Sequence, residues 1–297
     1  MASPIVSVET LAGWIETGRP DLRVVDVRWY LGKPRGAGRA AYDAGHLPGA
    51  IHVDVDRELV APSGPGRHPL PDPATFQATL AARGIGDGDL LVAYDDVGGW
   101  VAARLWWMLD DLGFRNGAVL DGGIGAWSAA GFPLTTEVPD PSRATLHLAP
   151  AWQRVVDRDT LRPLLGDILL LDARAAPRYR GEVEPIDAVA GHIPTALNAP
   201  TDGNLAGDGR FLEPVQLRER FDDLRSAARS GGLAVDEDAA GLVVTSCGSG
   251  VSACHNALAM RIAGLPDPLL YPGSYSDWSL AGEAVAVGPE PGPRPHP

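Results

Sequence analysis

Residues 44–50 read AGHLPGA, and residues 190–196 read AGHIPTA. Two further pairs of segments repeat in the same order along the chain: VVDVR at 24–28 with LLDAR at 170–174, and LDGGIGAW at 120–127 with YPGSYSDW at 271–278. A repeat that extends over most of a chain indicates two copies of one structural unit. The 297 residues are enough for two domains of ordinary size, so the sequence predicts a tandem arrangement.

Each copy has the pattern of an α/β domain. Short apolar runs alternate with segments of helical periodicity, which is typical of a mainly parallel sheet flanked by helices. Helices are predicted over residues 74–83, 101–112, 215–228 and 251–262. The predicted domains span residues 1–136 and 151–286, with a proline-containing linker at 137–150. The Pro- and Gly-rich tail at 287–297 cannot bury a core and is predicted to be disordered.

The second copy places a cysteine between a predicted strand and a predicted helix. Residues 241–245 (GLVVT) read as a buried strand, and Cys247 opens the loop that leads to the helix. Unpaired N–H groups and the dipole at a helix N-terminus favour an anion there by about 0.3–1 kcal/mol. Gly248 and Gly250 allow the loop to turn with positive φ and to aim successive N–H groups at one point. Cys247 is therefore a candidate nucleophile, and a buried small hydrophobic residue is the alternative until the loop sequence and the repeat are considered.

The loop CGSGVSA at 247–253 resembles the active-site loop of the rhodanese-like sulfurtransferases, and its Gly-Ser-Gly portion resembles the 3-mercaptopyruvate branch. The thiosulfate branch typically carries basic residues just after the cysteine, and none stands here. A tyrosine-phosphatase-like loop would need an arginine six positions after the cysteine to hold phosphate, and that position is Ala253. The resemblance therefore implies two tandem rhodanese-like domains and a sulfurtransferase.

The implied reaction takes sulfane sulfur from 3-mercaptopyruvate or thiosulfate as a Cys247 persulfide. A thiophilic acceptor such as cyanide or a thioredoxin-like protein then removes it, and no metal or organic cofactor is implied. A thiosulfate-preferring enzyme and a non-catalytic sulfur-carrier or interaction module stay open as alternatives, although the intact Cys247 loop argues against the module. The first copy reads LVAYDDVGGW at 91–100 where the second has its strand and loop, so it is predicted to be catalytically silent.

The resemblance also assigns roles to residues around Cys247. Family members pair the serine of this loop, here Ser249, with a histidine and an aspartate from the first domain, and the matching residues are His68 and Asp56. His68 would exchange a proton with Ser249, and Asp56 would orient the imidazole. Further predicted substrate-binding residues are Arg178, Gly248, Gly250, Val251 and Ser252.

Arg178, in PRYRG at 177–181, aligns with the substrate-binding arginine of the family. Arg180 stays an alternative, because residues two apart in an extended chain share a face. The family pattern leads us to expect another arginine soon after Glu184-Pro185, but Ile186 and Asp187 follow. Arg178 is therefore expected to hold the anionic group of the donor alone. Thr195, at the place of Gly49, is expected to change the turn geometry.

The remaining features restrict the partners and the location. A net charge of -13 argues against nucleic acid or an anionic membrane as a partner. Apolar stretches are too short for a membrane span, and the N-terminus lacks the pattern of a signal peptide. A thiol that must stay reduced predicts a cytoplasmic location. Cys254 and His255 are expected to pack within the helix, and His46 and His192, at equivalent places in both copies, are expected to stabilise turns.

Overall fold

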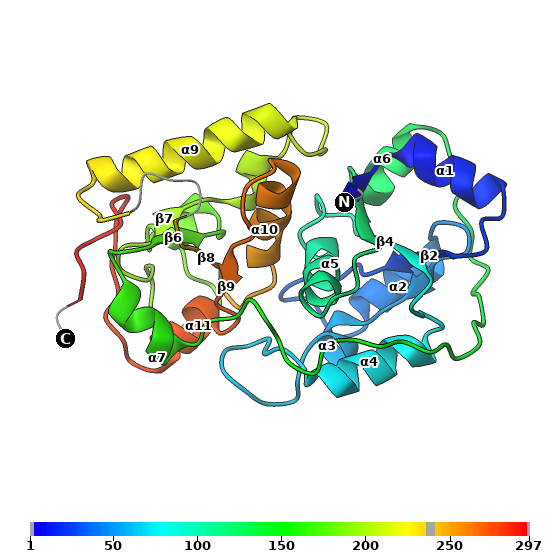
Figure 1. Ribbon diagram of the computed structural model, residues 1–297, viewed down its shortest axis with the longest axis horizontal. Helices are drawn as coiled ribbons and strands as arrows, with labels where there is room; N and C mark the ends of the chain where they lie inside the picture. Colours follow the sequence, from blue (N-terminus) through cyan, green and yellow to red (C-terminus); the bar gives the residue numbers. More distant parts are fainter. Residues whose placement is uncertain (1–2, 236–240, 296–297) are drawn as a thin grey trace. The chain divides into compact units, whose positions relative to one another are not determined.

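The computed structural model describes residues 3–235 and 241–295, which form two compact units (Figure 1). The first unit comprises Met1–Pro62, Leu70–Gln153 and Ala206–Phe211. The second comprises Ser63–Pro69, Arg154–Leu205 and Leu212–Pro297. The units correspond to the two copies in the sequence, except for two short exchanged segments. One of these, Ser63–Pro69, carries His68 into the second unit.

The first unit contains a five-stranded, fully parallel sheet. Its strands lie in the order β1 (Ile5–Val6), β5 (Gly117–Leu120), β4 (Leu90–Tyr94), β2 (Leu22–Asp26) and β3 (Ile51–His52). Its helices are α1 (Val8–Glu16), α2 (Ala37–Ala44), α3 (Val55–Glu58), α4 (Pro73–Ala82), α5 (Ala102–Asp111) and α6 (Gly123–Ala129). Leu11 of α1, Tyr42 of α2 and Trp127 of α6 pack with Val24 and Val92 in one core cluster. Every residue of α5 is buried, and the helix packs against β4 and β5.

The second unit contains a four-stranded parallel sheet. Its strands lie in the order β7 (Leu197–Asn198), β6 (Leu169–Asp172), β8 (Val243–Ser246) and β9 (Leu269–Leu270). Its helical segments are α7 (Arg158–Leu161), η1 (Arg162–Leu164), α8 (Ala176–Tyr179), η2 (Thr201–Asn204), α9 (Pro214–Ser230), α10 (Ala253–Ile262) and α11 (Ser274–Leu280). Figure 1 shows α9 over one side of this sheet, with α7 and α11 on the other. Leu161 and Trp278 join Leu170 and Val244 in the core between α7, α11 and the strands.

These sheets confirm the predicted α/β fold. The four predicted helices correspond to α4, α5, α9 and α10, each within two residues at either end. The apolar residues that begin VVDVR and LLDAR lie in β2 and β6, and both strands end at the aspartate of the segment. Among the described residues, no helix is both long enough and apolar enough to cross a membrane.

The repeated histidines hold equivalent turns together. His46 Nδ1 lies 2.8 Å from the Tyr42 carbonyl, and His192 Nδ1 lies 2.8 Å from the Tyr179 carbonyl. Each imidazole also stacks on its tyrosine, with ring centroids 3.8 Å apart in the first pair and 3.7 Å apart in the second. The prediction that both histidines stabilise turns is confirmed.

Two expectations differ from the structure. Thr195 has φ 67° where the equivalent Gly49 has φ 74°, so the turn keeps its left-handed conformation instead of changing. The tail is not free as far as it is described, because Pro291 accepts a hydrogen bond from Thr195 N and Glu290 O lies 3.1 Å from His192 Nε2. Glu137 O takes the corresponding place beside His46 Nε2, at 3.0 Å. The tail is therefore held as part of the repeat, although its composition is typical of disorder.

Candidate active site

Cys247 follows β8 directly, and its side chain is buried. The start of α11 fixes its backbone. Cys247 N donates to Ser274 Oγ at 3.1 Å, and the Cys247 carbonyl accepts from Tyr275 N at 3.0 Å. Ser274 has φ 52°, a left-handed conformation that is strained for serine. A strained residue with this contact indicates that the surrounding structure holds the cysteine in one position.

Two backbone N–H groups point at the sulfur of Cys247. The Gly250 N–H donates to Sγ at 3.1 Å, and the Ser249 N–H donates at 3.4 Å. Gly250 has φ 78°, and a Cβ atom there would lie 2.5 Å from the Pro272 carbonyl oxygen. Only glycine therefore allows this turn. N–H donors directed at one sulfur atom suit a thiolate, and they suit the negative charge of a persulfide equally.

Ser249 and His68 lie within hydrogen-bond distance of each other. The distance from His68 Nδ1 to Ser249 Oγ is 2.7 Å, and both side chains are buried. His68 comes from the segment Ser63–Pro69, which belongs to the second unit although it is distant in sequence. A buried hydroxyl beside an imidazole can pass a proton in either direction, because the imidazole both donates and accepts.

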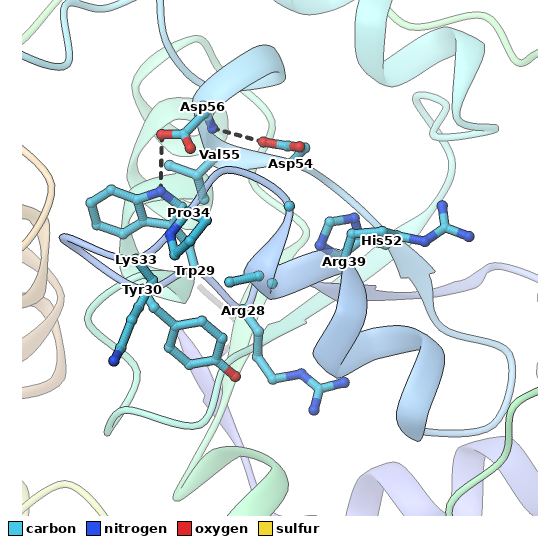
Figure 2. Close-up of a pocket in the computed structure, with 13 residues that line it drawn as sticks. Arg28, Trp29, Tyr30, Lys33, Pro34, Arg39, His52, Asp54, Val55 and Asp56 are labelled. Carbon is cyan, nitrogen blue, oxygen red and sulfur yellow. Dashed lines mark hydrogen bonds between the residues drawn. The ribbon is translucent and has the colours of Figure 1, made fainter.

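Asp56 belongs to the first unit, on the short helix α3. Its Oδ1 accepts a hydrogen bond from Trp29 Nε1 at 2.9 Å, and its backbone N–H donates to Asp54 Oδ1 (Figure 2). Figure 2 shows the Asp56 side chain beside the Trp29 indole. The role of Asp56 toward His68 stays a prediction.

Arg178 and Arg180 point in different directions. Arg178 lies on α8, where residues two apart are about 200° apart around the axis, so the extended chain assumed from the sequence is wrong. Arg178 Nη2 lies 2.8 Å from Glu184 Oε1 and 3.2 Å from Asp187 Oδ2. Arg180 instead pairs with Glu182, a side chain 54% exposed, at 2.7 Å. Arg178 Nη1 also lies 3.4 Å from the point that a Cβ atom of Gly248 would occupy, so Arg178 faces the Cys247 loop and Arg180 pairs at the surface.

A second arginine, Arg67, escaped the sequence analysis. Its Nη1 forms an ion pair with Asp187, and its Nη2 lies 2.9 Å from the point that a Cβ atom of Gly248 would occupy. Arg178 is thus not the only guanidinium near the loop, contrary to expectation. The available signal was its place directly before His68, but no pattern within residues 63–69 indicates where the loop returns to the second unit.

The two carboxylates of this cluster titrate in opposite directions. Burial alone would raise the pKa of Glu184, but hydrogen bonds from Asp187 N, Arg178 and Ile186 N lower that pKa below its ordinary value. For Asp187, burial is the largest effect and raises the pKa, while Arg67 and Arg178 oppose it and Glu184 adds to it. Asp187 is therefore the carboxylate of the pair that takes up a proton first as pH falls.

The other loop residues continue from the cysteine to the helix. Val251 and Ser252 precede α10, which begins at Ala253, two residues later than predicted. The Cys254 side chain is fully buried, and its Sγ donates to the Gly250 carbonyl at 3.5 Å. His255 Nδ1 lies 3.0 Å from Asn204 Nδ2, also in the interior. Both residues pack within the second unit, as predicted.

The first unit has an aspartate at the place of the nucleophile. Asp95 follows β4 as Cys247 follows β8, and its side chain is fully buried. Its carboxylate accepts hydrogen bonds of 2.8–2.9 Å from four backbone N–H groups, those of Val97, Gly99, Val101 and Ala102. Burial raises the pKa of Asp95, and the four N–H donors oppose that shift. In the first unit, the backbone N–H groups of the loop after β4 therefore bind the Asp95 carboxylate.

Three comparisons relate the chain to known proteins. The family model of the rhodanese-like domain matches it twice, at residues 7–130 and 157–281. The chain is 47% identical over 265 residues to a "Probable 3-mercaptopyruvate sulfurtransferase" of Pseudomonas aeruginosa, with 87% of this chain and 89% of the relative covered. It is 34% identical over 287 residues to thiosulfate sulfurtransferase of Rattus norvegicus, with 92% and 91% covered. The solved structure of 3-mercaptopyruvate sulfurtransferase from Leishmania major matches with a TM-score of 0.79 and 32% identity, covering 93% of this chain and 74% of that one.

Proposed function

We propose that this chain, which belongs to the family of sulfurtransferases with tandem rhodanese-like domains, prefers 3-mercaptopyruvate as donor and carries the sulfur on Cys247. The contact that carries this proposal is the 2.7 Å distance between His68 Nδ1 and Ser249 Oγ, two residues from the nucleophile. A 2-oxo acid donor needs a proton relay at its carbonyl end, and thiosulfate does not.

In the proposed first step, the Cys247 thiolate attacks the sulfur of 3-mercaptopyruvate. The bond between sulfur and carbon breaks, and its electron pair moves into the carbonyl group to give an enolate. The thiol proton of the donor passes through Ser249 and His68 to the carbon, which releases pyruvate and leaves a Cys247 persulfide. The Ser249 and Gly250 N–H groups that point at Sγ would hold the developing negative charge.

In the second step, an acceptor attacks the outer sulfur and regenerates the Cys247 thiolate. Cyanide would give thiocyanate, and a dithiol protein such as a thioredoxin-like partner would take the sulfur as its own persulfide. We place this cycle in the cytoplasm, because a buried but reactive thiol must stay reduced between turnovers. Asp56 is proposed to orient His68.

A thiosulfate-preferring enzyme is the second candidate. It is favoured by the two guanidinium groups beside Gly248, since Arg67 and Arg178 would bind a sulfonate as well as a carboxylate. The relatives include proteins named for each donor, at 47% and 34% identity.

The test is a steady-state comparison of the two donors with cyanide as common acceptor. We expect kcat/KM for 3-mercaptopyruvate to exceed that for thiosulfate by at least tenfold. A tenfold ratio corresponds to a difference in transition-state stabilisation of about 1.4 kcal/mol. A higher kcat/KM for thiosulfate would replace the first candidate with the second. Transfer from neither donor, with Cys247 intact, would contradict both.

A further inference from the structure

Two guanidinium groups lie on one side of the loop that begins at Cys247. If Gly248 carried a Cβ atom, that atom would lie 2.9 Å from Arg67 Nη2 and 3.4 Å from Arg178 Nη1. The residue directly after the nucleophile therefore has two positively charged forks beside it. An anion that accepted hydrogen bonds from both forks would lie close to the backbone of the reactive loop.

Asp187 connects these two arginines. Its Oδ1 forms an ion pair with Arg67 Nη1, and its Oδ2 lies 3.2 Å from Arg178 Nη2. The Asp187 side chain is only 6% exposed. A carboxylate held by two guanidinium groups has the charge and oxygen geometry that the carboxylate of a 2-oxo acid would present there.

Arg67 retains hydrogen-bonding capacity after this pairing. Its Nε and Nη2 atoms are buried and have no hydrogen-bond partner within the described part of the chain. Buried N–H groups without an acceptor are costly, so an anion that accepts from them is stabilised. Arg67 and Asp187 also line a surface hollow of about 450 Å³, through which a small anion can approach the pair.

Hydrogen bonds through Ser276 hold the backbone of Arg67 close to the reactive loop. Arg67 N donates to Ser276 Oγ at 3.0 Å, and Ser276 N donates to the Gly248 carbonyl at 2.9 Å. Gly66 has φ 75°, and a Cβ atom there would lie 2.5 Å from the Gly273 carbonyl oxygen, so the approach to α11 requires glycine. The start of α11 thus positions both Arg67 and Gly248.

We infer from this arrangement that Arg67 is a second donor-binding residue, and that Asp187 occupies its guanidinium until an anionic donor displaces the carboxylate. The inference rests on the proposed function, because it assigns the carboxylate of the donor to Arg67 and Arg178. It also explains how Ile186 can stand where the family pattern leads us to expect an arginine. The second guanidinium comes from residues 63–69 instead.

The first experiment compares Arg67→Gln with Arg180→Gln. Arg180 is a matched control, because its guanidinium pairs with Glu182 at the surface. Loss of one charge-assisted hydrogen bond corresponds to about 10- to 100-fold in binding. We expect Arg67→Gln to raise the KM for 3-mercaptopyruvate by that factor with a much smaller change in kcat, and Arg180→Gln to change neither. A wild-type KM in Arg67→Gln overturns the inference.

A double-mutant cycle with Asp187→Asn separates donor binding from simple neutralisation of Asp187. If Arg67 only balances that carboxylate, Arg67→Gln has no effect on KM once residue 187 is asparagine. If Arg67 binds the donor, Asp187→Asn alone lowers KM, and adding Arg67→Gln still raises it about tenfold. Arg67→Lys keeps the charge without the planar fork, so its KM should fall between wild type and Arg67→Gln. That variant keeps the test decisive if Arg67→Gln does not fold.

A third measurement is independent of sulfur transfer. Cys247 is alkylated with iodoacetate, which carries a carboxylate, and with neutral iodoacetamide, and both rates are followed by peptide mass spectrometry. We expect Arg67→Gln to lower the rate with iodoacetate relative to the rate with iodoacetamide about tenfold, and Arg180→Gln to leave this ratio unchanged. An unchanged ratio in Arg67→Gln overturns the inference alone. The ratio could fall in Arg67→Gln as expected while the wild-type protein does not turn over 3-mercaptopyruvate. That result would contradict the proposed function and leave the inference standing.

Discussion

The two cysteines lie seven residues apart, yet their sulfur atoms have opposite surroundings. Cys247 Sγ accepts from the N–H groups of Ser249 and Gly250, whereas Cys254 Sγ donates to the Gly250 carbonyl. N–H groups directed at a sulfur atom stabilise negative charge on it, whereas a carbonyl beside a sulfur atom accepts its S–H hydrogen. The two positions therefore differ in chemistry although both are buried.

Cys247→Ser is expected to abolish sulfur transfer without unfolding the chain, because a hydroxyl is far less nucleophilic and has a similar volume. Cys254→Ser should keep most of the activity. Mass spectrometry after treatment with the donor should find one added sulfur on Cys247. A persulfide confined to Cys254, or full turnover by Cys247→Ser, would contradict the mechanism.

His68→Ala is expected to slow transfer from 3-mercaptopyruvate far more than transfer from thiosulfate, which has no carbonyl to protonate. General acid–base catalysis typically contributes about 10²–10⁴-fold, so kcat with 3-mercaptopyruvate should fall by that order. Parallel measurement of both donors provides the control within one variant. Equal, small losses on both donors would leave His68 only a packing role beside Ser249.

The residues of a local motif could be placed from the sequence. Residues brought in by a distant loop could not be placed from the residue pattern, and His68 was expected beside Ser249 only because of the family resemblance. The reactive loop is local, so Cys247, Gly250 and Ser249 follow from one short segment. Arg67 comes close to Gly248 only because residues 63–69 return to α11. No periodicity in those residues reports that return, so the second guanidinium appears only in the structure.

At the scale of the elements, the turn after β8 depends on one glycine. Gly250 combines φ 78° with a Cβ position 2.5 Å from the Pro272 carbonyl oxygen. Gly250→Ala must shift the loop, which moves the N–H donors away from Sγ. We expect activity to fall at least about 100-fold, the scale found when a single oxyanion-hole donor is removed.

Gly49→Ala is the matched control for that variant. Gly49 has φ 74°, with no atom within 4 Å of its Cβ position. The substitution therefore adds about 1–2 kcal/mol of backbone strain from the left-handed conformation, without a steric clash. Denaturant unfolding should show this loss, and activity should stay near that of the wild type. If Gly250→Ala retained activity as Gly49→Ala does, the geometry of the loop would not be essential.

The ion-pair cluster of Arg67, Arg178, Glu184 and Asp187 should make binding of the donor depend on pH. Asp187 faces Arg67, Arg178, Glu184 and Tyr275; the pKa of Glu184 is lowered and burial raises that of Tyr275 to about 12. Of these groups, Asp187 has the raised carboxyl pKa and is protonated first as pH falls. Its negative charge then disappears and both guanidinium groups become available to the donor.

The KM for 3-mercaptopyruvate is therefore expected to decrease as pH falls through the pKa of Asp187, while the carboxylate of the donor stays ionised. Asp187→Asn should flatten this dependence, because the amide does not titrate. Steady-state KM values across a pH series for both proteins provide the measurement. The same slope in Asp187→Asn would assign the pH effect to another group.

For the whole molecule, the repeat predicts the architecture but not how the two copies differ. Equivalent pairs such as His46 with Tyr42 and His192 with Tyr179 preserve the same framework in both units. The sequence repeats the histidines but not the tyrosine positions, because Tyr42 lies 4 residues before His46 and Tyr179 lies 13 residues before His192. The place of the tail could not be predicted, since Glu290 contributes a backbone carbonyl, which any residue could supply.

The first unit places Asp95 directly after β4, and its carboxylate accepts hydrogen bonds from four backbone N–H groups. Asp95→Asn replaces one acceptor oxygen by an NH₂ group that faces N–H donors. We expect the free energy of unfolding to fall by about 1–3 kcal/mol, the cost of leaving buried polar groups unpaired. Activity measured well below the melting temperature should remain, since Cys247, Ser249 and His68 belong to the second unit. Loss of activity with unchanged stability would show that Asp95 itself takes part in the reaction, and would end the description of the loop after β4 as catalytically silent.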